Sequence, residues 1–124
     1  MAALRPQILV IDDEPQILRA LRINLSVRGY EVLTAATGTE ALKLAAERRP
    51  DVIVLDLGLP DVDGIELISQ VRRWSEVPIV VVSARHDSHG KIAALDAAGF
   101  DIHCHAIGDA AVRAALARAG ALAY

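Results

Sequence analysis

The sequence has few of the residues that would place it in a specialised class of protein. Its single cysteine, Cys104, excludes an internal disulfide and fits a reducing cytosol. Only one Trp, two Tyr and one Phe are present, so the core must be mainly aliphatic. The N-terminus has no long apolar run of the signal-peptide kind, and no stretch approaches membrane-spanning length. We therefore expect a cytoplasmic domain with no membrane partner.

A positive charge excess is also missing. The chain carries 13 basic and 16 acidic residues, for a formal net charge of -3, so we expect no nucleic-acid binding by this domain alone. Its 124 residues are 53% hydrophobic, which favours a folded chain over a disordered one. This length is typical of one domain with a real core. We expect residues 1–124 to form a single domain.

Short β-forming runs alternate with amphipathic stretches five times along the chain. The expected strands cover residues 7–11, 30–35, 51–56, 77–82 and 101–107. The expected helices start at Pro15, at the capping box Thr37–Glu40, at Ile65, at Ser88 and near Asp109. This alternation predicts an α/β fold with helices on both faces of a parallel sheet. The common arrangement is the flavodoxin-like, doubly wound, five-stranded sheet of order 2-1-3-4-5.

Carboxylates follow two strands that this order makes neighbours. Asp12 and Asp13 follow the first strand, and Asp56 ends the third. Taken alone, Asp56 would be read as a helix cap or a turn residue. Three neighbouring carboxylates repel one another unless a cation lies among them, and oxygen ligands suit Mg²⁺. A carboxylate beside Mg²⁺ can act as a nucleophile toward a phosphoryl group. Ser83, after the fourth strand, could then bond a phosphoryl oxygen or simply cap a turn.

Three motifs together resemble the receiver domain of bacterial two-component response regulators. These motifs are Ile-Leu-Val-Ile-Asp12-Asp13-Glu-Pro, Val-Ile-Val-Leu-Asp56-Leu-Gly-Leu-Pro60-Asp-Val-Asp-Gly64 and Pro-Ile-Val-Val-Val-Ser83-Ala-Arg. Two further stretches, ending at Tyr30 and spanning Lys91 to Ala97, are similar to the potassium-transport (Kdp) group of the winged-helix subfamily. The resemblance covers about residues 7–97.

The resemblance implies a signalling module and not an enzyme. It implies that Asp56 receives a phosphoryl group from a sensor histidine kinase. It implies that Mg²⁺ is held by Asp13 and Asp56 directly, by Asp12 through water and by the backbone carbonyl of Gly58. It also implies that Ser83 is the switch hydroxyl. The subfamily carries its DNA-binding domain after the receiver, and none follows before Tyr124, so we expect no promoter binding.

The chain departs from the family pattern near its end. The family ends its fifth strand with Lys-Pro-Phe, and His105-Ala106-Ile107 stands in that place here. A histidine with an ordinary pKa near 6.5 is mostly neutral at pH 7, so the permanent cation is lost. We therefore expect weaker phosphorylation and an impaired switch. Arginines that the family uses for dimerisation are displaced, which predicts a monomer or weak homodimer.

The last stretch, from Ala98 to Arg113, resembles one strand-helix unit of a metal-dependent amidohydrolase barrel. This predicts a chimera, with residues 1–97 receiver-derived and residues 98–124 of amidohydrolase-like origin. An engineered chimera, a natural fusion and a frameshift product all fit. His105 aligns with a barrel metal ligand and could draw a transition metal to the carboxylates. Two alternative functions stay open: a folded chimera without signalling activity, and a metal-binding or hydrolase-like site that uses His105.

Overall fold

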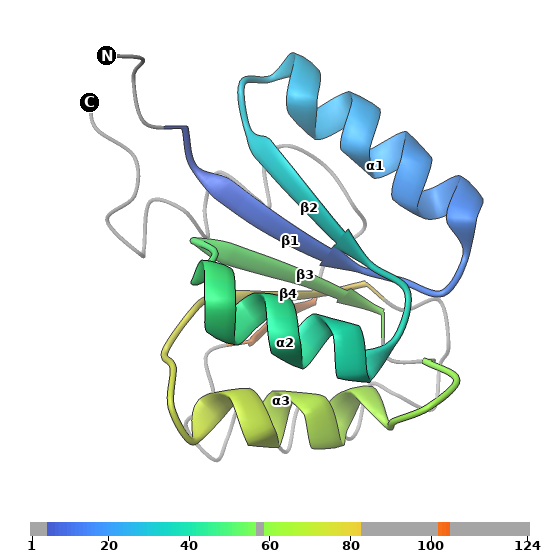
Figure 1. Cartoon of the computed structure of the whole chain (residues 1–124). Coiled ribbons are helices and arrows are strands. Elements are labelled where there is room, and N and C mark those ends of the chain that lie inside the picture. The colour runs from blue at the N-terminus through green and yellow to red at the C-terminus, as the bar shows by residue number, and fades with distance from the viewer. Residues whose placement is uncertain (1–4, 57–58, 83–101, 105–124) are drawn as a thin grey trace.

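Five parallel strands form one sheet in the order β2-β1-β3-β4-β5, which confirms the predicted flavodoxin-like α/β fold (Figure 1). The computed structural model describes residues 5–56 and 59–82, and the backbone of 102–104. The strands are β1 (Gln7–Ile11), β2 (Glu31–Ala35), β3 (Val52–Asp56), β4 (Ile79–Val82) and β5 (Ile102–Cys104). The described helices are α1 (Pro15–Val27), α2 (Gly38–Arg48) and α3 (Gly64–Arg72).

The strands bury alternate side chains in two separate layers, because successive residues of a strand point to opposite faces. On β1, Ile8 and Val10 pack in the layer under α1, with Leu21 and Leu25 of that helix. Leu9 and Ile11 pack in the opposite layer, beneath α2 and α3. Figure 1 shows α1 on one side of the sheet and the other two helices on the other side. Such double coverage explains why these strands read as unbroken apolar runs.

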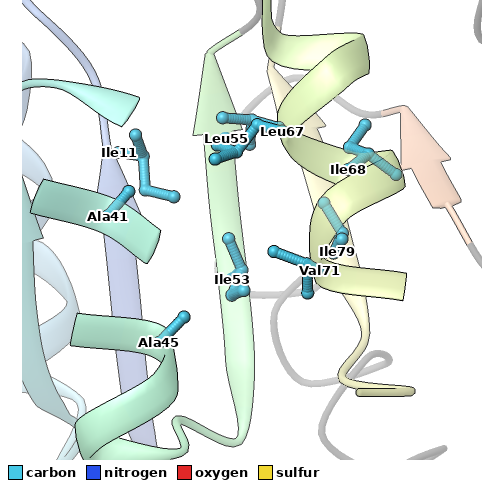
Figure 2. A pocket seen from close by; sticks show the side chains of 9 residues that line it. All are labelled: Ile11, Ala41, Ala45, Ile53, Leu55, Leu67, Ile68, Val71 and Ile79. Carbon is cyan, nitrogen blue, oxygen red and sulfur yellow. The ribbon is translucent and has the colours of Figure 1, made fainter. Parts of the chain in front are cut away.

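A void of about 10 Å³ lies in the layer beneath α2 and α3. Figure 2 shows the side chains that line it, which are Ile11, Ala41, Ala45, Ile53, Leu55, Leu67, Ile68, Val71 and Ile79. All nine are apolar, and a buried water needs polar partners, so we expect this space to stay dry.

The helix ends follow the sequence signals closely. Gly29, just past the end of α1, has φ +92°, as expected of a glycine that ends a helix. Thr37 caps α2 by accepting a hydrogen bond from the Glu40 amide at 3.2 Å. The Glu40 carboxylate accepts from Ala36 at 3.2 Å, one residue earlier than the predicted capping box requires. The start of α2 is therefore held by side chains of its own first turn.

Several element boundaries differ from the predictions by one or two residues, among them the starts of β2 at Glu31 and of α3 at Gly64. β3 begins at Val52, because the Asp51 carboxylate instead accepts the Gln7 amide of β1 at 2.7 Å. β4 begins at Ile79, after Pro78, whose nitrogen has no hydrogen to donate. α3 ends at Arg72, because the next amides bond three residues back and tighten the last turn.

Several predictions lie outside the described residues. These are the helices expected over 88–98 and after Asp109, the residues Gly58, Ser83 and His105, and the ends of the strand expected over 101–107. Within that strand, the backbone of Ile102–Cys104 pairs in parallel with β4. None of the described helices combines the length and the apolar character that spanning a bilayer requires.

Candidate metal centre

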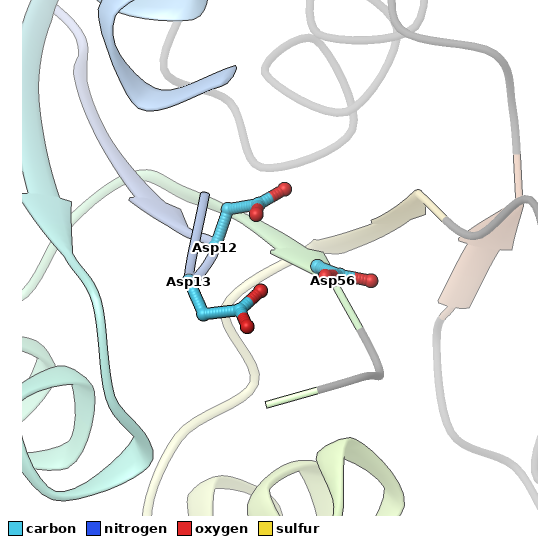
Figure 3. Close-up of side chains that lie close together, drawn as sticks. All are labelled: Asp12, Asp13 and Asp56. Carbon is cyan, nitrogen blue, oxygen red and sulfur yellow. The ribbon is translucent and has the colours of Figure 1, made fainter. Parts of the chain in front are cut away.

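Three carboxylates meet at the carboxyl ends of two neighbouring strands (Figure 3). The register of β1 and β3 pairs Ile11 with Leu55, so Asp12 and Asp56 leave the sheet side by side. Each of Asp12, Asp13 and Asp56 offers an oxygen within 4.8 Å of the others. The sheet order places this group at the topological switch point between β1 and β3. From β1, the chain adds β2 on one side of the sheet and then β3 on the other.

The three side chains differ in their contact with solvent. Asp12 is 5% exposed and is the buried carboxylate among the described residues, whereas Asp13 is exposed and Asp56 is intermediate. Two backbone bonds fix Asp12: its amide donates to Ala35 at 3.1 Å, and its Oδ1 accepts from the Glu14 amide at 2.9 Å. The buried carboxylate is thus held rigidly beneath two more accessible ones.

Burial raises the pKa of Asp12, and the negative charges of Asp56, Asp13 and Glu14 raise it further. The hydrogen bond from the Glu14 amide opposes this shift, but the net direction is upward. The ionised form of a carboxyl group in this position is energetically unfavourable. A divalent cation among the three oxygens would remove the repulsion, and hard oxygen donors with water-accessible positions suit Mg²⁺. The residues present therefore fit a magnesium ion.

The three described donors are carboxylate oxygens. The side chains of all four histidines and of Cys104 lie outside the part of the chain that the structure describes. Gly58, Ser83 and His105, which the sequence also assigned to this site, fall outside that part. Their roles stay predictions, and so do the individual roles of the three carboxylates.

Sequence reasoning missed Asp61, which lies in the loop between β3 and α3. Its carboxylate accepts hydrogen bonds from the backbone amides of Gly38 and Thr39, at 2.8 and 3.1 Å, and from the Thr39 hydroxyl at 3.0 Å. These bonds, chiefly the one from Gly38, lower the pKa of Asp61. An aspartate in a Pro- and Gly-rich loop normally indicates a turn, and no local pattern shows that it caps a distant helix.

Comparison with known proteins identifies the class of protein that this fold and site define. The family model of the response regulator receiver domain matches residues 8–117, and the chain belongs to that family. This confirms the resemblance drawn from the motifs around Asp12 and Asp56. The match also extends past residue 97, where the receiver-derived part was expected to end.

Within the family, the chain is similar to the KdpE transcriptional regulators. It is 62% identical over 94 residues to the transcriptional regulatory protein KdpE of Mycobacterium tuberculosis, covering 76% of this chain and 42% of that protein. It is 51% identical to the KDP operon regulatory protein KdpE of Escherichia coli, again over 94 residues with 76% and 42% covered. The chain therefore spans less than half the length of these curated relatives.

Solved structures agree with this assignment. The signal receiver domain of a putative LuxO repressor protein from Vibrio parahaemolyticus superposes with a TM-score of 0.81 at 23% identity, over 94% of each chain, which shows the shared fold. The response regulator TrrA of Thermotoga maritima, solved in complex with Mg²⁺-BeF, has a TM-score of 0.75 at 26% identity, covering 94% of this chain and 99% of that one.

Proposed function

We propose that this chain is a phosphoacceptor module that receives a phosphoryl group on Asp56 with the help of Mg²⁺. The observation that carries the proposal is the gathering of Asp12, Asp13 and Asp56 within 4.8 Å, with Asp12 buried among its neighbours' charges. The three carboxylate oxygens are hard ligands of the kind that suits Mg²⁺. The Mg²⁺-BeF complex of TrrA supports the same ion at the corresponding kind of site.

The three carboxylates take different parts in the proposed reaction. By resemblance to the family, Asp13, Asp56 and the backbone carbonyl of Gly58 would hold Mg²⁺ directly, and Asp12 would hold it through water. When bound, the ion neutralises charge on the incoming phosphoryl group. An Asp56 carboxylate oxygen forms a bond to phosphorus as the phosphorus–nitrogen bond of a phosphohistidine breaks, and the electron pair leaves with the imidazole nitrogen. Asp56 can meet such a donor because it is not fully buried.

The donor that fits this chemistry is a sensor histidine kinase. We propose that Ser83 then bonds the phosphoryl group and reports its presence. The KdpE relatives are transcriptional regulators of which this chain spans 42%. We propose that DNA contact belongs to other parts of such proteins, and that this domain is a monomer or weak homodimer.

The segment around His105 sets the strength of the switch. With His105 in place of the family lysine, we propose slow phosphorylation and weak propagation of the signal. The resemblance of residues 98–124 to an amidohydrolase unit offers one origin for this replacement, although the receiver family match runs to residue 117. If His105 cannot replace the positive charge of the family lysine at all, the outcome is a folded protein with no signalling activity.

Intact mass spectrometry after incubation with Mg²⁺ and acetyl phosphate tests the proposal. We expect one added phosphoryl group on the parent protein and none on Asp56→Asn, because the amide is not a nucleophile. Asp63→Asn is the matched control: Asp63 lies on the same loop but caps α3 by accepting the Ile65 amide at 3.0 Å, so this variant should still be labelled. EDTA should abolish labelling.

The same experiment, followed over time, measures whether His105 slows phosphorylation. His105→Lys should be labelled faster than the parent at equal Mg²⁺, because it restores a permanent positive charge beside the phosphoryl group. Equal labelling rates would show that His105 does not limit the reaction. Absence of any adduct on a parent that circular dichroism shows to be folded would instead establish a folded chain without receiver chemistry.

A further inference from the structure

The loop that follows the phosphoacceptor strand is bound to the start of a different helix. Asp61 accepts the Gly38 amide on Oδ1 at 2.8 Å, and the Thr39 amide and hydroxyl on Oδ2 at 3.1 and 3.0 Å. We call these three residues the Asp61 clamp. They join positions 22 and 23 residues apart in sequence, so the clamp is a tertiary contact and not a local turn.

A second observation shows how closely the loop approaches α2. Gly38 is buried, and a Cβ atom built on it would collide with Cγ1 of Val62. The same Cβ would lie 3.2 Å from Cβ of Val62 and 3.4 Å from Oδ1 of Asp61. Only glycine therefore allows the clamp to close at this position. Hydrogen bonds and packing thus hold the loop against α2 at the same place.

Both ends of the clamp lead directly back to the carboxylates. On one side, Asp61 lies five residues after Asp56. On the other side, Gly38 lies three residues after Ala35, whose carbonyl accepts the Asp12 amide at 3.1 Å. The clamp therefore links the chain that leaves β3 after Asp56 to the chain that leaves β2 beside Asp12.

We propose that Asp61 is a positioning residue for the Mg²⁺ site, a role that rests on the proposed function. Repulsion between Asp12, Asp13 and Asp56 favours a rearrangement that moves the three carboxylates apart. The clamp opposes such a rearrangement, because it holds Asp61, five residues after Asp56, against the start of α2. A site held in place before the ion arrives binds it more tightly than one that must be assembled. The hydrogen bonds from Gly38 and Thr39 favour the ionised form of Asp61, which is why its pKa is lowered.

The test compares Mg²⁺ affinity in three proteins by isothermal titration calorimetry, with thermal melts in EDTA for each. Asp61→Ala removes the clamp. Thr37→Ala is the matched control, because it removes the bond from the Glu40 amide at 3.2 Å that caps α2 but does not touch the loop. Asp61→Glu is the conservative variant. We expect Asp61→Ala to raise the Kd for Mg²⁺ roughly tenfold, the low end for outer-shell supports of a metal site.

Thr37→Ala should lower the melting temperature while leaving the Kd for Mg²⁺ unchanged, and Asp61→Glu should recover part of the affinity. If Asp61→Ala melts lower but binds Mg²⁺ as the parent does, Asp61 is only a structural cap and the inference is overturned. If Thr37→Ala weakens Mg²⁺ equally, general stability of α2 is responsible and the inference also fails. A parent that binds no Mg²⁺ overturns the proposed function itself, which the parent titration alone reveals.

Discussion

At the scale of single residues, the main feature is one buried charge. Asp12 is 5% exposed, and burial together with neighbouring carboxylates raises its pKa. A carboxyl group with a raised pKa favours the folded state less once it ionises. Its contribution to stability therefore falls as pH rises from its ordinary pKa of 3.8 through the raised value. At neutral pH and without a cation, Asp12 acts against folding.

We therefore predict that Asp12→Asn stabilises the protein in EDTA at pH 7. The asparagine oxygen can still accept the Glu14 amide, and the charge is gone. The gain is expected because the fold disfavours the ionised form of Asp12, as its raised pKa indicates, and asparagine carries no charge. Thermal melts with and without Mg²⁺ measure it, and the variant should lose much of the stabilisation that Mg²⁺ confers on the parent.

Asp51→Asn is the control for this prediction. Asp51 also accepts a backbone amide, that of Gln7 at 2.7 Å, but it precedes β3 and lies at the opposite edge of the sheet from the three carboxylates. Neutralising it should not raise the melting temperature. A gain of equal size in both variants would mean that net charge, and not repulsion within the site, opposes folding.

At the scale of elements, short polar motifs set the helix ends. Gly29 takes φ +92° after α1, and the α2 cap residue Arg49 takes the left-handed φ of 47° before Pro50. Both ends agree with sequence signals, because a helix end depends on residues within one turn of it. At a helix start, Asp63 caps α3 by accepting the Ile65 amide on its side chain.

Gly29→Ala should destabilise the protein by about 1–2 kcal/mol, the usual penalty for an L side chain in the left-handed region. A Cβ at Gly29 would meet no atom within 4 Å, so the loss arises from the backbone alone. Urea unfolding of the variant and of Gly29→Asn measures it. Asparagine tolerates this conformation better and should lose less. Equal losses would point to a side-chain clash instead.

At the scale of the whole molecule, two apolar layers hold the sheet between its helices. The layer beneath α2 and α3 joins those helices to β1, β3 and β4. Figure 2 shows nine buried side chains of this layer, which line a void of about 10 Å³. Because protein interiors are closely packed, these side chains leave little freedom for the strands that carry Asp12 and Asp56 to shift.

Ile68→Ala should destabilise the protein by about 2–5 kcal/mol, because this side chain is fully buried and its removal leaves a cavity. Urea unfolding measures the change. Ile23→Ala, at an apolar side chain of α1 that is 57% exposed, is the control and should have little effect. A small loss at Ile68 would mean that α3 can collapse onto the sheet and fill the space.

The sequence by itself determined the elements, their order in the sheet and the family, because these depend on local patterns and on motifs read along the chain. Short apolar runs that alternate with amphipathic stretches predicted β1 to β4. Asp12, Asp13 and Asp56 were singled out because they stand at the carboxyl ends of two of those runs. Boundaries moved by one or two residues where a side chain competed for a backbone bond, as Asp51 does with Gln7.

Only the tertiary structure decided how the carboxylates differ and what braces them. Nothing in the local sequence distinguishes Asp12, which is buried, from Asp13, which is exposed. Burial depends on which chain segments pack over a residue, and here those segments come from distant parts of the sequence. The bonds from Gly38 and Thr39 to Asp61 likewise appear only when β2 and β3 lie on either side of β1. Distances between remote residues are set by sheet register and packing, which local patterns do not encode.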